Sequence, residues 1–359
     1  MVHQLTRRRF VRDTATAAAA VAAGLPRAAQ SDAAAILNHN PDMEYRRCGR
    51  TELMISAVAL GGHWKRVVQV IGGKEPSGWM TTKIKRKDFQ QNRHDVVTRC
   101  IQRGINYIDA CCGEEILAYS RALQGRRDKM YLGYSWHAKE SRYEKWRSLK
   151  KLQQGLDEGM KKAGLDYIDI WRITLLVDSS QHTPSELESV IAALDWAKQT
   201  GRARFTGLSS HEREHLTTLV DTYGDTLDVV LTPYTARTRT VEDSAGLWAA
   251  ITKHDLGWFG IKPFASNSVF MGDSSPDSPH FEEDNRIARL ALRYILCNPA
   301  ITAPIPGLIS VQQVDNAALA VKERRELDVA ESEELARAMD RAWQGLPRGY
   351  NWLKNWETV

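Results

Sequence analysis

Short apolar runs recur along this chain and alternate with longer segments whose apolar residues follow a helical spacing. Such alternation is typical of parallel strands joined by helical crossovers. Eight strand–helix pairs in roughly 300 residues predict an α/β fold, the (β/α)8 TIM barrel. The strands are expected at residues 55–60, 105–109, 130–135, 167–173, 203–209, 228–231, 257–264 and 301–306.

A doubly wound open sheet is the alternative to a barrel. The dinucleotide-binding form of that sheet carries Gly-x-Gly-x-x-Gly directly after an early strand. The nearest glycine pair in this chain, Gly61 and Gly62, lacks that spacing. The glycine pattern therefore favours the barrel.

Two helices are clearly marked by their end signals. The apolar spacing over residues 143–163 is helical, and Gly164 is expected to end that helix. A second helix is expected to begin at Thr183 as the N-cap, with Pro184 in the first turn and Glu186 completing a capping box. Two stretches without a confident element are expected to form long loops, residues 64–92 and 267–284.

The first 35 residues differ from the rest of the chain. Arg7 and Arg8 are followed by Phe10 and then by an Ala-rich, weakly apolar run. A basic region, an apolar region and small residues near a cleavage site are typical of a secretory signal, and the paired arginines resemble a twin-arginine export signal. We therefore expect residues 1–35 to bind the twin-arginine export machinery and the protein to be periplasmic or extracellular. A disordered basic tail is the alternative.

Two classes of partner receive little support from the sequence. The net charge is +5, but much of the surplus lies in the N-terminal segment, and no concentrated basic stripe follows, so nucleic-acid binding is not expected. No other apolar run approaches the roughly 20 residues of a membrane span, so the mature protein is expected to have none.

Five cysteines occur at positions that do not match metal-ligand spacing, so no metal site is predicted. Cys111 and Cys112 are adjacent and directly follow a predicted strand. In an oxidising compartment they could form a vicinal disulfide or provide a reactive thiol. They could equally be two small residues, one facing inward and one outward.

Several segments, in order and at consistent intervals, resemble the aldo/keto reductases. They include "MEYRRCGRTELMISAVALGG" (43–62), "GINYIDA" (104–110), "KAGLDYIDIW" (162–171), "GRARFTGLSSH" (201–211) and "IPGLISVQQVDN" (305–316). The resemblance implies a (β/α)8 barrel over residues 43–345, followed by a tail over 346–359. It also implies NADP(H) as the cofactor and reduction of a small-molecule carbonyl, with Tyr as the general acid and Asp, Lys and His assisting.

The resemblance also places the family's four catalytic positions on this sequence. Asp109 matches the family's acid, but Cys112 stands where the Tyr is expected. Ser135 replaces the Lys at the end of the third strand, and Thr174 replaces the His at the end of the fourth. A thiol cannot take over the proton-donating role of a phenol unchanged, because it is a better nucleophile than proton donor.

Other residues are candidates to complete the site. Arg172 lies two residues before Thr174 and could share its inward face and meet Asp109, as a structural pair or as an anchor for an anionic substrate. His137 and His211 follow strand ends and are acid–base candidates. Cys112 remains a candidate as a thiol.

The cofactor-binding positions implied by the resemblance are only partly retained. Ser209 and Ser210 stand at the nicotinamide end, whereas Leu231 replaces a Gln. Backbone N–H groups near a helix start suit a phosphate, and Lys262 suits a phosphate or ribose. The positions at the phosphate and adenine end are Gly307, Leu308, Ser310, Gln313 and either Asp315 or Asn316.

Two functions remain open at this point. One is an NADP-dependent oxidoreductase with a rebuilt active site that acts on a carbonyl or sugar-like molecule. The other is a non-catalytic or non-redox barrel that binds a nucleotide or another small ligand. Trp352 and Trp356 in the tail either line the pocket or pack outside the barrel.

Overall fold

The computed structural model describes residues 36–73, 83–240 and 246–359. The chain divides into two compact units, Met1–Leu37 and Asn38–Val359. The export signal expected at residues 1–35 lies outside the described residues, so it stays a prediction. The account below concerns the second unit.

An antiparallel hairpin, β1 (Tyr45–Arg47) and β2 (Met54–Ser56), opens this unit. Gly49 in the hairpin loop has a φ of +49°, and a Cβ on it would lie 2.3 Å from the backbone nitrogen of Gly257. This close approach holds the hairpin against the start of a barrel strand, at the end of the barrel opposite the site described below. The expected strand at 55–60 is therefore wrong in part: residues 55–56 pair within the hairpin, whereas residues 59–60 join the barrel.

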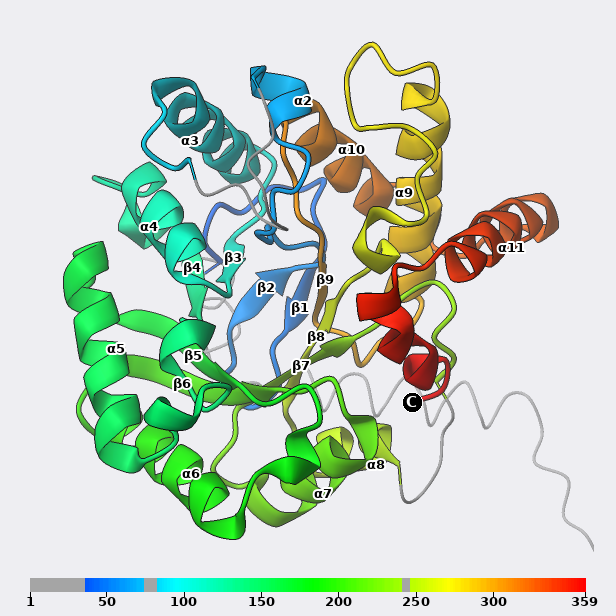
Figure 1. Ribbon diagram of the computed structural model, residues 1–359. Helices are drawn as coiled ribbons and strands as arrows, with labels where there is room; N and C mark the ends of the chain where they lie inside the picture. Colours follow the sequence, from blue (N-terminus) through cyan, green and yellow to red (C-terminus); the bar gives the residue numbers. More distant parts are fainter. Residues whose placement is uncertain (1–35, 74–82, 241–245) are drawn as a thin grey trace, which may run out of the picture. The chain divides into compact units, whose positions relative to one another are not determined.

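Seven parallel strands follow and hydrogen-bond to their neighbours in chain order, β3 through β9 (Figure 1). Residues 59–61 take the remaining place in the ring. Ala59 N–H donates to the Pro304 carbonyl at 3.1 Å, and Leu60 N–H donates to the Tyr107 carbonyl at 2.9 Å. The strands are Tyr107–Ala110 (β3), Tyr131–Tyr134 (β4), Ile168–Thr174 (β5), Ala203–Ser209 (β6), Val229–Pro233 (β7), Gly257–Ile261 (β8) and Ala303–Ile305 (β9).

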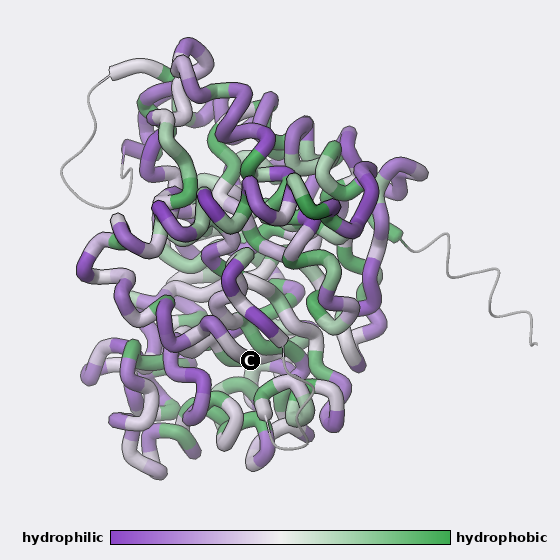
Figure 2. The backbone as a smooth tube through the Cα atoms, turned by 90° about the vertical axis from the view of Figure 1, so that its right-hand side faces the viewer, coloured by the Kyte–Doolittle hydropathy of each residue, from purple (hydrophilic) through white to green (hydrophobic). Residues whose placement is uncertain are grey.

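Helices cover the outside of this ring (Figure 1). In Figure 2, hydrophobic and hydrophilic positions alternate along these helices, as expected when one helical face packs on the strands. The α-helices are Val68–Ile71 (α2), Lys87–Gln102 (α3), Gly113–Ala122 (α4), Leu149–Ala163 (α5), Pro184–Gln199 (α6), Arg213–Tyr223 (α7), Leu247–Lys253 (α8), Phe281–Leu296 (α9), Val311–Lys322 (α10) and Val329–Gln344 (α11). Short 3-10 helices are Arg127–Lys129, His137–Lys139, Glu144–Trp146, Ser179–Gln181, Ala265–Asn267 and Arg348–Trp356 (η8).

The expected end signals at Gly164 and Thr183 are confirmed, but the helix expected over residues 143–163 begins later, at Leu149, because residues 144–146 form a separate 3-10 turn. Thr183 caps α6 in a full capping box with Glu186, and Pro184 is its first residue. Gly164 ends α5 in the left-handed conformation. Both expected loops are wrong in part: α2 and the start of α3 fall within residues 64–92, and the start of α9 falls within residues 267–284. Among the described residues, no helix is long and apolar enough to cross a membrane.

Candidate active site

A cavity of about 540 Å³ opens at the carboxyl ends of the barrel strands. Strand-end residues such as Asp109, Thr174, Ser209 and Ile261 line its floor, since every parallel strand ends at this face. The loop before α9, the start of α10 and the tail segment η8 supply its walls. Five basic and three acidic side chains line the cavity, so the net charge of its lining favours an anionic ligand.

At the floor, Asp109 and Arg172 form a buried ion pair. Arg172 Nη2 donates to Asp109 Oδ2 at 2.6 Å, and Arg172 Nε donates to Oδ1 at 3.2 Å. Burial by itself would lower the pKa of Arg172, but the Asp109 carboxylate outweighs it and raises that pKa above its usual value. The predicted meeting of these two residues across the barrel is confirmed.

A buried carboxylate joins the two positions where the family's Lys and His are replaced. Glu140 Oε2 accepts hydrogen bonds from the Ser135 hydroxyl at 2.6 Å and from the Thr174 N–H at 3.0 Å. Arg172 Nη1 also donates to Thr174 Oγ1 at 2.8 Å. Burial raises the pKa of Glu140, although these hydrogen bonds oppose the rise. Hydrogen bonds among Ser135, Thr174 and Glu140 therefore fill the two positions where the family has a Lys and a His.

The two adjacent cysteines lie in different places. Cys111 lines the cavity, and in this structure it is a free thiol that is not joined to Cys112 by the vicinal disulfide left open by the sequence. Cys112 is the N-cap of α4, is 2% exposed and is not among the cavity-lining residues. The prediction of Cys112 as the site thiol is therefore corrected: the chain turns into α4 at Cys112, which leaves Cys111 facing the cavity.

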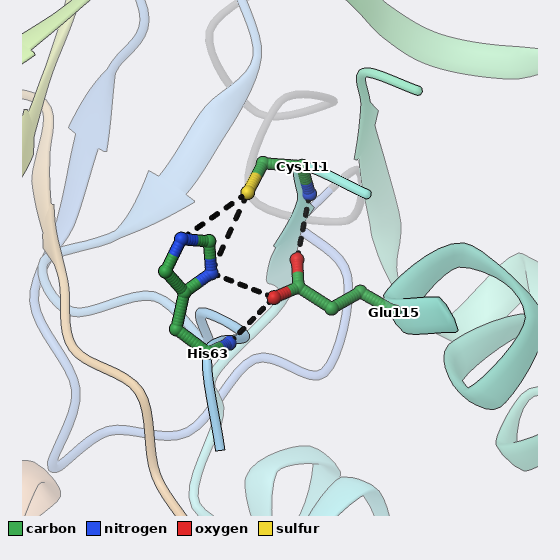
Figure 3. Close-up of side chains that lie close together, drawn as sticks. All are labelled: His63, Cys111 and Glu115. Atoms are coloured by element: carbon green, nitrogen blue, oxygen red, sulfur yellow. Dashed lines mark hydrogen bonds and ion pairs between the residues drawn. The ribbon is translucent and has the colours of Figure 1, made fainter. Parts of the chain in front are cut away.

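Cys111 belongs to a cluster with His63 and Glu115, whose ligand-type atoms all lie within 4.8 Å of one another (Figure 3). Glu115 Oε1 accepts from the His63 N–H at 2.5 Å and lies 2.7 Å from His63 Nδ1, and Oε2 accepts from the Cys111 N–H at 2.7 Å. The Cys111 sulfur lies 3.5 Å from His63 Nδ1 and 3.6 Å from Nε2. Spacing along the sequence indicated no metal site, and it missed this cluster because His63 precedes Cys111 by 48 residues.

Backbone details place this cluster. His63 has a φ of +58°, and a Cβ on Gly62 would lie 2.0 Å from the Glu115 carboxyl carbon. The Gly62–His63 turn therefore bends around the carboxylate. Burial raises the pKa of Glu115, but the charge and hydrogen bonds of His63 outweigh it and lower that pKa to about 2. Burial raises the pKa of the Cys111 thiol.

Both predicted histidines line the cavity. His137 Nδ1 lies 2.8 Å from the Cys111 carbonyl. The His211 ring stacks on Trp352 with ring centroids 3.9 Å apart, and its buried Nδ1 has no hydrogen-bond partner among the described residues. Burial lowers the pKa of His211, so the imidazole is neutral near pH 7. Trp352 lines the cavity, whereas Trp356 is buried and donates its indole N–H to the His211 carbonyl at 2.8 Å.

The tail also brings a phenol to the cavity, which sequence reasoning missed. Lys65 Nζ donates to Tyr350 Oη at 2.8 Å, and Lys262 Nζ lies 6.0 Å from the centroid of the same ring. Burial would raise the pKa of Tyr350, but Lys262, Lys65 and a bond from Ser266 lower it below its usual value. Tyr107 brings a further phenol near the floor, with its hydroxyl 3.4 Å from Asp109 Oδ1.

A family model described as the aldo/keto reductase family matches residues 77–339. The chain belongs to the aldo/keto reductase family. It is 26% identical over 313 residues to an L-galactose dehydrogenase from Arabidopsis thaliana, with 79% of this chain and 90% of the relative covered. It is 23% identical over 271 residues to an L-glyceraldehyde 3-phosphate reductase from Escherichia coli K12, with 69% and 70% covered.

Solved aldo/keto reductases share the fold. One from Klebsiella pneumoniae in complex with NADPH matches with a TM-score of 0.59 and 18% identity, covering 82% of this chain and 94% of that one. The holo form of one from Bacillus halodurans matches with a TM-score of 0.57 and 18% identity, covering 82% and 96%. The predicted family and (β/α)8 fold are thus both confirmed.

In this member of the aldo/keto reductase family, most positions expected to hold the cofactor line the cavity. Ser210 and Ser310 do not: the Ser210 hydroxyl bonds to Ser179 at 2.9 Å, and Ser310 caps α10 by accepting from Gln313 N–H. The expected residues that do line it are Ser209, Lys262, Gly307, Leu308, Gln313 and Asn316.

The polar groups at the start of α10 bond to one another. Gln313 Oε1 accepts from the Ile309 N–H at 2.9 Å, and Asn316 Oδ1 accepts from Arg289 at 2.7 Å. A Cβ on Gly307 would lie 2.3 Å from the Gly62 carbonyl oxygen, so the loop before α10 packs against the Gly62–His63 turn. The helix start and the neighbouring Lys262 fit an anionic cofactor end, whereas Leu231 at the other end is buried outside the cavity lining.

Proposed function

We propose that this protein is an NADP(H)-binding oxidoreductase that acts on a carbonyl or sugar-like small molecule through a rebuilt active site. The observation that carries the proposal is the continuous basic cavity that runs from the Asp109–Arg172 pair to the start of α10. It places an anion-favouring region and a set of titratable side chains in one space at the barrel face where such enzymes react. The names of the two sugar-related relatives support the substrate class.

When bound, NADPH would supply the hydride, and the chain must supply the proton. Tyr350 is our candidate proton donor in place of the missing family Tyr. Its oxygen accepts a bond from Lys65, so its own O–H is left to donate to a substrate oxygen. The lowered pKa of Tyr350 brings the phenol closer to the neutral range in which a general acid works best.

The other cavity residues would position ligands. Lys262 and the N–H groups near Gly307 would hold phosphate oxygens, and Arg172, fixed by Asp109, would orient an oxygen of the substrate. His211, stacked on Trp352, would bond to a substrate hydroxyl through Nδ1, which has no hydrogen-bond partner in the part of the chain that the structure describes.

Titration of the purified full chain with NADPH, followed by the cofactor's fluorescence, tests this function. We expect a dissociation constant in the micromolar range and about tenfold weaker binding for Lys262→Gln, as for the loss of one charge-assisted hydrogen bond. Lys253→Gln is the matched control, because Lys253 ends α8 just before β8 begins, far from the cavity mouth, and is not among the cavity-lining residues.

The non-catalytic binding barrel is the second candidate, and the loss of the family's Tyr, Lys and His favours it. Turnover of NADPH with a panel of aldoses and hydroxyaldehydes separates the two candidates. Turnover that Tyr350→Phe abolishes supports the enzyme. NADPH binding without turnover of any panel member supports the binding barrel, and absence of NADPH binding removes the main support for the redox function.

We also propose that the protein is exported in folded form by the twin-arginine machinery. Arg7, Arg8 and Phe10 support this proposal. In a producing bacterium, fractionation should place the wild-type chain outside the cytoplasm and retain the Arg7→Lys/Arg8→Lys variant inside. Equal distribution of the two chains would contradict export by this route.

A further inference from the structure

We propose that His63, Cys111 and Glu115 bind one Zn²⁺ ion through an imidazole nitrogen, a thiolate and a carboxylate oxygen, with a fourth position open to the cavity. Nothing in the chemistry of hydride transfer requires this site, so the proposal is independent of NADP(H) binding.

The donor set suits zinc. Imidazole, thiolate and carboxylate are the three ligand types that Zn²⁺ uses in proteins, and catalytic zinc sites keep three protein ligands and one open position. Magnesium and calcium prefer oxygen ligands alone, so a site with sulfur and nitrogen disfavours them. A cluster of one N, one S and one O donor therefore points to a borderline transition metal, with Zn²⁺ the most common choice.

The spacing of the donors also fits. Zn–S and Zn–N bonds of about 2.3 and 2.0 Å at a tetrahedral angle put the two ligand atoms about 3.5 Å apart. The Cys111 sulfur lies 3.5 Å from His63 Nδ1. Glu115 Oε1 is nearer to Nδ1, at 2.7 Å, because the two share a hydrogen bond. Metal binding needs that contact to open by less than about 1 Å, through a small rotation of the side chains.

A thiol–imidazole pair for nucleophilic catalysis fits the geometry less well. Such a pair needs the sulfur in line with one ring nitrogen while the carboxylate bonds to the other. Here the sulfur is almost equidistant from both nitrogens, at 3.5 and 3.6 Å, and the carboxylate shares Nδ1. The three side chains lie side by side, as Figure 3 shows, so a rotation of the His63 ring would turn one nitrogen toward a position between the sulfur and the carboxylate, where an ion would sit.

The supporting contacts are those of a built site. Glu115 is fully buried, and its two oxygens bond to the backbone N–H groups of both other members. His63 and Cys111 line the cavity, so a bound ion would face the Asp109–Arg172 pair. An ion there would act as a Lewis acid on a substrate oxygen, at the part of the site from which the family's Tyr is missing.

Titration of the metal-stripped full chain with Co²⁺ alone, and then Zn²⁺ in competition, tests the site. We expect one Co²⁺ per chain, visible d–d bands typical of four-coordinate geometry, and a near-ultraviolet thiolate-to-cobalt band that one equivalent of Zn²⁺ removes. No band, or Co²⁺ bound without a thiolate band, would overturn the proposal. NADPH is absent from this experiment, so failure of the cofactor proposal does not affect it.

Variants identify the ligands. Cys111→Ser should abolish the thiolate band and weaken Zn²⁺ binding at least tenfold, and His63→Gln should weaken Zn²⁺ binding at least tenfold and keep the thiolate band. Cys297→Ser, at an exposed thiol after α9, is the matched control and should leave both unchanged. Circular dichroism of each variant separates loss of a ligand from loss of the fold. A folded Cys111→Ser protein that keeps the thiolate band would contradict the assignment.

Discussion

At the scale of single residues, the Asp109–Arg172 pair dominates the floor of the site. Both side chains are almost fully buried, at 6% and 4% exposure. Two charges removed from water are stable only when each satisfies the other, so the loss of one partner is far more costly than the loss of an exposed pair.

We expect Arg172→Met to lower the free energy of unfolding by about 3–5 kcal/mol, because Asp109 is left as a buried, uncompensated charge. Urea denaturation of the full chain measures this loss. Arg337→Met is the control: Arg337 and Glu333 are both 65% exposed, and losses there are about 0–1 kcal/mol. Similar losses for the two variants would mean that the buried pair contributes little.

Tyr350 gives a prediction that needs no substrate. Its pKa is lowered by Lys262 and Lys65, so its phenol should lose its proton at lower pH than an ordinary tyrosine. The tyrosinate absorbance of the wild type minus that of Tyr350→Phe, followed against pH, should rise with a midpoint below about 10. In turnover, a general acid must carry its proton, so activity should fall as pH rises through the same midpoint. A difference titration centred above 10 would contradict this.

Residue-level prediction from the sequence succeeded where one element carries the information. Strand alternation placed Arg172 on the same face as Thr174 and opposite Asp109, and the structure agrees. It failed where the chain leaves a strand, because a turn of one residue decides whether Cys111 or Cys112 meets the cavity. It could not find His63 or Tyr350, which reach the site only through the closed fold.

At the scale of elements, the helices follow their local signals. The capping box of α6 was readable from Thr183 and Glu186 because both partners lie within one turn. The first strand was not predicted correctly, because the apolar run at 55–60 contributes to both the hairpin and the ring. Only hydrogen bonds to residues distant in the sequence determine where the hairpin ends and the ring segment begins.

The ion pair between Glu331 on α11 and Arg293 on α9 should make the free energy of unfolding depend on pH. Hydrogen bonds from Arg293 on α9 lower the pKa of Glu331 to about 2. The folded pKa lies below the unfolded value of about 4.3, so this stabilisation is present above that value and is lost as pH falls towards 2. The stability difference between wild type and Glu331→Gln should therefore shrink from pH 6 to about pH 2 in urea denaturation.

The control for this prediction is Glu333→Gln, which removes an exposed carboxylate from the same helix. Its loss should be small near neutral pH, where that of Glu331→Gln is largest. A Glu331→Gln difference that stays constant down to pH 2 would show that the Arg293 contact does not depend on the carboxylate charge.

At the scale of the whole unit, the C-terminal tail completes the cavity. Trp356 is 1% exposed, and Val359 N–H donates to the Arg239 carbonyl at 3.0 Å. Trp356→Ala should lower stability by about 3–5 kcal/mol and speed hydrogen exchange over residues 347–359. Trp352→Ala, which removes a partly exposed ring, should have the smaller effect. Equal exchange in wild type and Trp356→Ala would show that the tail is held elsewhere.

Between β9 and β3, the place in the ring is taken by a short segment outside the named strands. Residues 59–61 bridge β9 and β3 with a few isolated hydrogen bonds, whereas β5 and β6 share a continuous ladder. Local opening should begin at residues 59–61, and their amide hydrogens should exchange faster than those of β5. His63 follows residues 59–61 and Cys111 follows β3, so a Zn²⁺ ion bound to both side chains would link these two segments. Adding Zn²⁺ should then slow amide hydrogen exchange at residues 59–61 and leave exchange in the β5–β6 ladder unchanged.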